Sequence, residues 1–173
     1  MLQAIIRYDV SVCLFLNRAL RAQVVHRLFA LVSRLGDGVF WYVLMGLMPL
    51  LLGGQPGLTA ALHLAGVGLV GTLIYKVIKQ GTARPRPYDV VSAIKLGCDP
   101  LDLYSFPSGH TLHAVAFTII ALSYLSALAW ILMPFTILVA ASRVILGLHY
   151  PTDVACGAII GASCAWVSLL IVG

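Results

Sequence analysis

Three short clusters of polar residues in this 173-residue chain carry side chains that could do chemistry together. Cations bind phosphate oxygens and stabilise the charge that develops on them, and the planar fork of arginine can bind two such oxygens at once. The clusters combine cations, two histidines and a carboxylate, which are the groups needed to handle a phosphate ester. They lie at 79–87, 106–110 and 142–153.

Two histidines in these clusters suggest a divided task, in which one imidazole attacks phosphorus and the other protonates the leaving oxygen. A carboxylate on the far nitrogen of the attacking imidazole would fix its tautomer. His149 and Asp153 are four residues apart, so a helix that begins at Pro151 could bring them together. Ser108 and Gly109 precede an apolar stretch and could offer backbone N–H groups at a helix N-terminus, which is an anion site.

The composition tells where such a site would lie. Hydrophobic residues make up 61% of the chain and charged residues 10%, against roughly 45–50% and 25% in soluble proteins. This excludes a water-soluble globule, and it excludes disorder, which needs low hydrophobicity and high charge. The net charge of +5 comes from eight Arg, three Lys and six Asp. These charges are too few for a nucleic-acid-binding protein and favour a lipid head group or a phosphorylated substrate.

We therefore expect an all-α fold, a polytopic transmembrane helical bundle, because lipid offers no partner for an unpaired backbone group. A spanning helix needs roughly 20 largely apolar residues, and five stretches are candidates, of which four are clear and one is somewhat short. They are 39–52, which can be extended backward through 24–35, then 58–78, 111–128, 129–146 and 152–172.

The N-terminal residues 1–36 differ, because charged and apolar residues alternate there at helical spacing. We expect an amphipathic arm that lies at the membrane interface. A sixth span in this segment is the alternative, at the cost of burying several charges. The domain division predicted from the sequence is thus 1–36 for the arm and 37–173 for the transmembrane domain.

The order of the spans places the polar clusters on one side of the membrane. The loop 79–110 and the junction 143–153 are separated by two crossings, so both lie on the same face. No Asp, Lys or Arg occurs in 53–75, 111–142 or 154–173. A membrane protein that gathers its charges in one place is expected to build a site there.

The clusters also resemble the signatures of the type-2 phosphatidic acid phosphatase family of membrane lipid phosphatases. Those signatures are Lys, six residues, Arg-Pro; then Pro-Ser-Gly-His; then Ser-Arg, five residues, His, three residues, Asp. All eleven fixed positions are present here, in order and with the family spacing. The resemblance covers about 58–172.

The resemblance implies a role for each matched residue. His149 would be the nucleophile that forms a phosphohistidine, His110 the general acid that later activates water, and Asp153 the residue that orients His149. The family needs no metal and no cofactor, and the four cysteines here form no Cys-x-x-Cys pair. The phosphate would be bound by Lys79, Arg86, Ser108, Gly109 and Arg143.

The expected function is that of an integral membrane phosphatase that hydrolyses a lipid phosphate or diphosphate. Undecaprenyl diphosphate, phosphatidylglycerophosphate and phosphatidic acid all fit, and the sequence does not choose among them. We expect a multi-pass protein of the cell inner membrane with its site on the extracytoplasmic face, where bacterial members of the family commonly work. A non-hydrolytic lipid-phosphate binder or transporter is a second hypothesis, but it would not need the paired histidines. A vanadium-dependent haloperoxidase is a third, but those enzymes are soluble.

Other residues receive simpler interpretations. Arg84 lies outside the signature, and catalytic and interfacial roles are equally favoured. His113 lies one helical turn after His110 and is expected to pack on the third span, with substrate contact as the alternative. Trp41 fits a lipid-facing or interfacial aromatic residue. Asp102 is expected to be a solvated loop residue.

Overall fold

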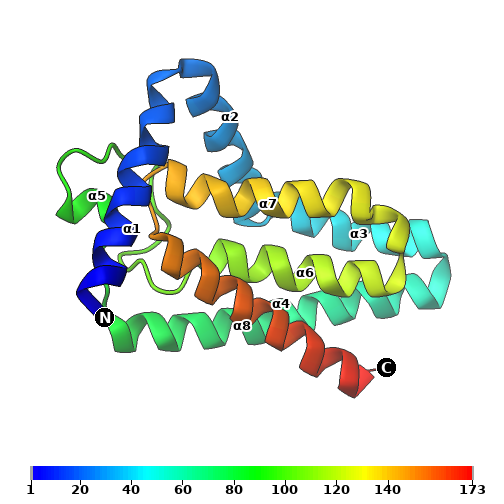
Figure 1. Ribbon diagram of the computed structural model, residues 1–173. Helices are drawn as coiled ribbons and strands as arrows, with labels where there is room; N and C mark the ends of the chain where they lie inside the picture. Colours follow the sequence, from blue (N-terminus) through cyan, green and yellow to red (C-terminus); the bar gives the residue numbers. More distant parts are fainter. Residues whose placement is uncertain (1, 173) are drawn as a thin grey trace.

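The computed structural model describes residues 2–172, and in that range the chain is a bundle of helices without a β-strand (Figure 1). The expected all-α class is therefore confirmed. In chain order the elements are α1 (Leu2–Asn17), the 3₁₀ turn η1 (Arg18–Arg21), α2 (Gln23–Arg34), the π turn η2 (Leu35–Val39), α3 (Phe40–Leu52), α4 (Gly54–Thr82), α5 (Pro87–Val90), α6 (Gly109–Tyr124), the 3₁₀ turn η3 (Ser126–Leu128), α7 (Ala129–Ile145) and α8 (Pro151–Val172).

Several of these helices match the spans expected from hydropathy. The helical stretches long and apolar enough to cross a membrane are Gln23–Leu52, Gly54–Val90, Ser126–Ile145 and Pro151–Val172. The first joins α2, η2 and α3, as the backward extension through 24–35 anticipated. The remaining expected span corresponds to α6, which has 16 residues and ends at Tyr124 rather than at 128. The protein is thus a multi-pass helical bundle, and five crossings stay a prediction.

Helix α6 lies at the centre of the bundle and is covered by α4, α7 and α8. Two glycines let α8 approach it closely. A Cβ atom at Gly157 would lie 2.5 Å from the carbonyl oxygen of Ser108, and one at Gly161 would overlap the backbone of Leu112. Since only glycine fits at such distances, the first half of α8 is fixed against the start of α6.

Trp41 was expected to face the lipid or the membrane interface, but it is buried in the bundle. Its side chain is 1% exposed and packs against Phe117 and Phe135, with ring centroids 5.3 and 5.6 Å away. Trp41 lies on the face of α3 that covers the core, so hydropathy alone could not separate an inward tryptophan from an interfacial one. Trp130 and Trp166, by contrast, are exposed on the bundle surface.

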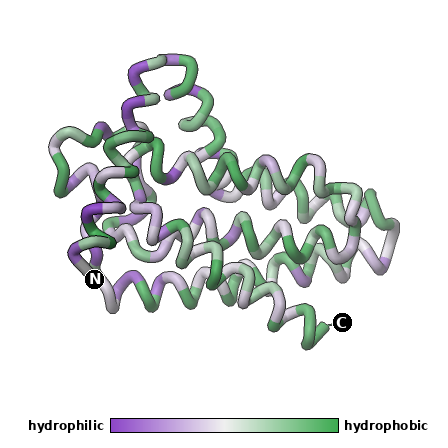
Figure 2. Tube along the Cα trace, in the orientation of Figure 1, coloured by the Kyte–Doolittle hydropathy of each residue, from purple (hydrophilic) through white to green (hydrophobic). Residues whose placement is uncertain are grey.

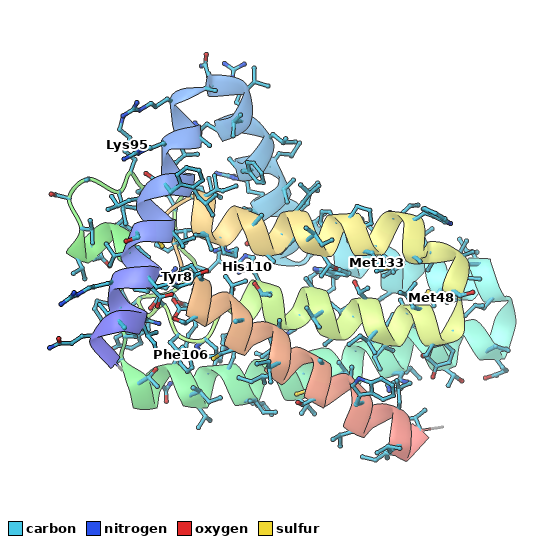
Figure 3. The ribbon with its side chains drawn as sticks, in the orientation of Figure 1. Tyr8, Met48, Lys95, Phe106, His110 and Met133 are labelled. Carbon is cyan, nitrogen blue, oxygen red and sulfur yellow. The ribbon has the colours of Figure 1, made fainter. Side chains whose placement is uncertain are left out.

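Hydrophilic residues gather at one end of the bundle, while the long helices are mostly apolar (Figure 2). Helix α1 runs across this polar end and packs against α7 and α8 (Figure 1). Side chains from separate segments, including Tyr8, Phe106 and His110, lie toward this end, and Met48 and Met133 lie toward the other (Figure 3). The polar clusters thus lie together at one end of the bundle, whereas their membrane face and the domain division at 36/37 stay predictions.

Candidate active site

The first cluster reaches the polar end because α4 stops there. Ala83 has a left-handed conformation (φ 45°), and its N–H donates to the carbonyl oxygen of Lys79 at 3.0 Å. This αL cap ends the helix and turns the chain back over the end of the bundle. Ser105 then holds the turn, because its hydroxyl donates to the carbonyl oxygens of Arg84 and Pro85 at 3.2 and 3.0 Å.

The second cluster caps α6. The hydroxyl of Ser108 accepts the N–H of Thr111 at 3.4 Å, which is the usual role of an N-cap serine. The backbone N–H of Ser108 donates to the carbonyl oxygen of Asp153 at 3.0 Å. The second and third clusters are therefore joined directly through the backbone.

The third cluster is formed by a tight curl after α7. The N–H groups of Leu148 and His149 both donate to the carbonyl oxygen of Arg143 at 3.0 Å. Gly147 permits the curl with φ +75°, a conformation that residues with a Cβ atom rarely adopt. Because of this curl, the five residues between Arg143 and His149 bring the two side chains to the same place.

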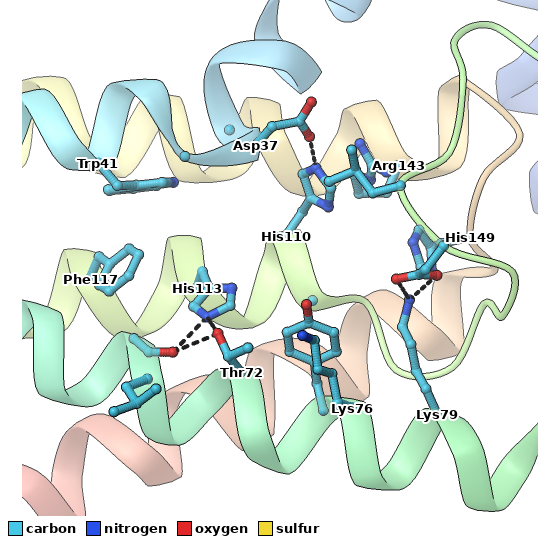
Figure 4. Close-up of a pocket in the computed structure, with 18 of the residues that line it drawn as sticks. Asp37, Trp41, Thr72, Lys76, Lys79, His110, His113, Phe117, Arg143 and His149 are labelled. Atoms are coloured by element: carbon cyan, nitrogen blue, oxygen red, sulfur yellow. Dashed lines mark hydrogen bonds and ion pairs between the residues drawn. The ribbon is translucent and has the colours of Figure 1, made fainter.

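The three clusters enclose the polar end of a cavity of about 940 Å³ (Figure 4). Most of the sequence-predicted site residues line it, namely Lys79, Arg86, Gly109, His110, Arg143 and His149. Ser108 and Asp153 do not line the cavity, but the hydrogen bond between their backbones joins the second and third clusters, which do. The other end of the cavity is apolar and is lined by Trp41, Met45, Ala65, Leu69 and Phe117. The cavity thus joins a cationic end to a hydrophobic end.

Asp102 is not the solvated loop residue that the sequence suggested. Both of its carboxylate oxygens accept hydrogen bonds from Lys79 Nζ at 2.7 Å, and Oδ1 also accepts from Arg86 at 2.7 Å. Burial alone would raise the pKa of Asp102, but these two cations hold it below its usual value. The carboxylate of Asp102 therefore fixes the positions of both Lys79 and Arg86, and no sequence pattern links Asp102 to these two residues.

Arg143 is buried, and its guanidinium donates to the hydroxyl of Ser33 from α2. No carboxylate in residues 2–172 lies within ion-pair distance of it, and its Nε has no hydrogen-bond partner in that range. A buried charge without a partner is costly. Its position at the polar end of the cavity suits a bound anion.

His149 is 1% exposed and sits between the cations and Asp153. Its Nε2 accepts a hydrogen bond from Arg86 at 3.4 Å, which leaves the ring proton on Nδ1. Nδ1 faces Asp153 Oδ2 at 3.7 Å, longer than a hydrogen bond. Burial and the charges of Arg143, Arg86 and Lys79 lower the pKa of His149 well below its usual value. Burial and these charges therefore favour the neutral imidazole, with a lone pair on the nitrogen beside the cations.

Sequence reasoning missed Asp37, which contacts Nε2 of His110 from η2 (Figure 4). It also missed Asp9, which pairs with Arg84. A Gly-Asp-Gly triplet at 36–38 was the only signal for Asp37. His113 hydrogen-bonds Thr72 and the carbonyl oxygen of Gly68 at 3.1 Å, so it packs between α4 and α6 as expected and also lines the cavity.

Known proteins share both the sequence pattern and the fold. An undecaprenyl-diphosphatase of Sulfolobus acidocaldarius is 34% identical over 104 residues, which is 59% of this chain and 48% of that protein. Undecaprenyl-diphosphatase BcrC of Bacillus subtilis is 33% identical over 113 residues, 65% of this chain and 58% of that protein. The chain thus spans about half the length of these relatives.

Two crystal structures have the same arrangement of helices. Aquifex aeolicus LpxE superposes with a TM-score of 0.78 at 25% identity, covering 94% of this chain and 95% of that one. A PAP2-type phosphatidylglycerolphosphate phosphatase of Bacillus subtilis gives 0.76 at 26% identity, covering 97% and 86%. The model of the PAP2 superfamily matches residues 60–173, a range that holds all three polar clusters. This match covers more than half of the chain, and the chain therefore belongs to the PAP2 superfamily.

Proposed function

We propose that this protein is an integral membrane phosphatase that hydrolyses a lipid phosphate or diphosphate through a phosphohistidine intermediate. The observation that carries the proposal is one cavity with two different ends. Its polar end is lined by the signature histidines and cations, and aromatic and aliphatic side chains line the other end. The signature groups are His110, His149, Lys79, Arg86 and Arg143. A lipid phosphate has the same division into a charged head and a hydrophobic tail.

In the first step, the lone pair of His149 Nε2 attacks phosphorus and forms a P–N bond. The bond between phosphorus and the leaving oxygen breaks, and His110 gives that oxygen a proton. In the second step, water attacks the phosphohistidine, the P–N bond breaks, and His110 takes the proton that water releases. Lys79, Arg86 and Arg143 stabilise the charge on the phosphoryl oxygens in both steps.

The remaining signature residues support these groups. Asp153 stabilises the cationic form of His149 that exists when the imidazole carries phosphorus, because its carboxylate faces Nδ1. Ser108 fixes the start of α6, and the N–H of Gly109 at that helix end adds a donor for the phosphate.

Undecaprenyl diphosphate is the first substrate to test, because two relatives are named undecaprenyl-diphosphatases. Phosphatidylglycerophosphate and phosphatidic acid follow, and one structural neighbour is titled a phosphatidylglycerolphosphate phosphatase. We place the protein in the cell inner membrane with its polar end on the extracytoplasmic side.

The experiment combines a substrate panel with rapid-quench trapping on protein purified in detergent. Wild type should release phosphate from at least one lipid and carry acid-labile, base-stable phosphate during turnover. His149→Ala should carry none, and His110→Ala should slow both steps. Phosphate labelling of His149→Ala at the wild-type level would show that another residue is the nucleophile. Binding of lipid phosphates without any release would favour the non-hydrolytic binder instead.

A further inference from the structure

A break between α2 and α3 brings a carboxylate to the cavity. The π turn Leu35–Val39 interrupts the helix, and Gly38 within it has φ +143°, which residues with a Cβ atom rarely adopt. Gly36 is buried against α7, where a Cβ atom would lie 3.1 Å from Val139. The two glycines let the chain pass close to α7 and turn, and Asp37 between them lines the cavity.

The carboxylate of Asp37 contacts Nε2 of His110, the second residue of α6 (Figure 4). Within residues 2–172, Asp37 takes part in no other ion pair. The other titratable and charged groups that line the cavity with His110 are mostly imidazoles and cations. They are His113, His149, Lys76, Lys79, Arg86 and Arg143, with the carboxylate of Asp102 paired to Lys79 and Arg86. The positive charge of Arg143 disfavours a second positive charge on His110, and Asp37 opposes that effect by direct contact.

We propose that Asp37 is a positioning residue that holds His110 in the orientation and charge state needed for proton transfer. This inference rests on the proposed function. With Nε2–H bound by the carboxylate, Nδ1 is the nitrogen left to exchange a proton. The Nδ1 proton passes to the leaving oxygen as its bond to phosphorus breaks, and the neutral ring, still held by Asp37, takes a proton from the attacking water in the second step.

A purely structural role makes different predictions. A carboxylate near the N-terminus of α6 would stabilise that helix through its dipole whatever the leaving group. A role in proton transfer depends on how much the leaving oxygen needs a proton. An alkyl phosphate releases a strongly basic alkoxide, whereas p-nitrophenyl phosphate releases a weakly basic phenolate that needs little help.

The test compares Asp37→Asn and Asp37→Ala with wild type on a lipid alkyl phosphate and on p-nitrophenyl phosphate. Asp37→Asn keeps the shape and removes the charge. We expect kcat on the alkyl phosphate to fall about 100-fold and kcat on p-nitrophenyl phosphate to fall only a few-fold, with KM little changed. Asp89→Asn is the matched control, because Asp89 is exposed and forms no ion pair in the described residues. It should behave like wild type on both substrates.

Nitrogen-15 NMR of the histidine rings in detergent gives a readout that does not need turnover. His110, assigned from its loss in His110→Ala, should be an imidazolium in wild type at a pH where it is neutral in Asp37→Asn. Equal loss of kcat on both substrates, or an unchanged His110 ring signal, would show that Asp37 has only a structural role. Absence of phosphate release by wild type from every substrate would instead defeat the proposed function, and the ring signal would still report on the Asp37–His110 pair.

Discussion

Arg84 donates a hydrogen bond to Asp153 Oδ1 at 2.5 Å, although Arg84 lies outside the three signatures. The same guanidinium pairs with Asp9 of α1 at 2.8 Å. Both carboxylates are fully buried, and Asp9 also accepts hydrogen bonds from the hydroxyl and N–H of Thr152 at 2.5 and 3.1 Å. The N-terminal helix therefore helps to fix the carboxylate that faces His149.

Arg84→Met should lower kcat by about 10–100-fold with a much smaller effect on KM. Asp153 would keep the Tyr150 N–H but lose its charged donor, while the phosphate-binding cations remain. The substitution should also destabilise the fold by about 3–5 kcal/mol, since Asp9 would be left buried without its cation. Steady-state kinetics and thermal unfolding in the same detergent measure the two effects separately.

The double variant Asp9→Asn with Arg84→Met separates stability from catalysis. The double variant removes one of the two buried carboxylates that Arg84 pairs with and leaves Asp153 without its cation. Part of the lost stability should therefore return while kcat stays low. Arg27→Met is the matched control, because Arg27 is exposed and forms no ion pair in residues 2–172. A wild-type kcat in Arg84→Met would show that Asp153 needs no support from Arg84.

Arg143→Lys should lose most activity although it keeps the charge. The Arg143 guanidinium is buried and donates to Ser33, and a planar fork can at the same time bind two oxygens of one phosphoryl group. The lysine ammonium is a point charge and cannot replace that geometry. We expect kcat/KM to fall by at least about 100-fold, which corresponds to the loss of one transition-state donor. Activity within a few-fold of wild type would mean that Arg143 supplies charge alone.

Much of the site could be predicted because its residues are ordered by local sequence. The spacing in 142–153 fits the end of one helix, a curl and the start of the next, and the structure closes that curl on the carbonyl oxygen of Arg143. The apolar stretches likewise predicted the helices, because lipid leaves the backbone no other choice.

The partners of these residues could not be predicted, because they come from distant segments. Asp102 joins Lys79 across 23 residues, Asp37 reaches His110 across 73, and Asp9 reaches Arg84 across 75. Each is a single aspartate with no periodic pattern around it, and its burial depends on how the helices pack. An isolated aspartate in a loop or in an amphipathic arm is usually solvated, so its sequence position predicts the opposite of what packing produces.

Activity should survive EDTA, and vanadate should inhibit. Cations fill the polar end of the cavity, and the nearby carboxylate of Asp102 is already bound by Lys79 and Arg86, so the site is built for an anion rather than for a divalent cation. Vanadate adopts the five-coordinate geometry of the phosphoryl transition state and should therefore bind tightly. Phosphate release measured with and without each reagent checks both statements. Loss of activity in EDTA that Mg²⁺ restores would contradict the mechanism.

A single cysteine at Ser92 should report the membrane side of the site. Ser92 is exposed in the loop that follows α5, at the polar end of the bundle. The background lacks Cys13, Cys98, Cys156 and Cys164. Ser92→Cys should react with a maleimide that cannot cross the inner membrane, added to cells whose outer layers are permeable but whose inner membrane is intact. Labelling only after lysis would place the site on the cytoplasmic side.

Activity should extend to acidic pH, because the nucleophile must be neutral and the pKa of His149 lies well below its usual value. The imidazole is deprotonated above its pKa, so lowering the pKa keeps the nucleophile available as the pH falls. An ordinary histidine has a pKa of about 6.5. The acid limb of the kcat profile should therefore lie below that pH.

Lys79→Met tests the cause of this shift. Lys79 is one of the cations that lower the pKa of His149, and removing it should raise that pKa and move the acid limb toward higher pH. Phosphate binding should weaken as well, so the shift must be measured in kcat at saturating substrate rather than in kcat/KM. Lys95→Met is the matched control, since Lys95 is exposed and outside the cavity, and its profile should overlay that of wild type. An acid limb that stays in place in Lys79→Met would show that burial alone sets the charge state of His149.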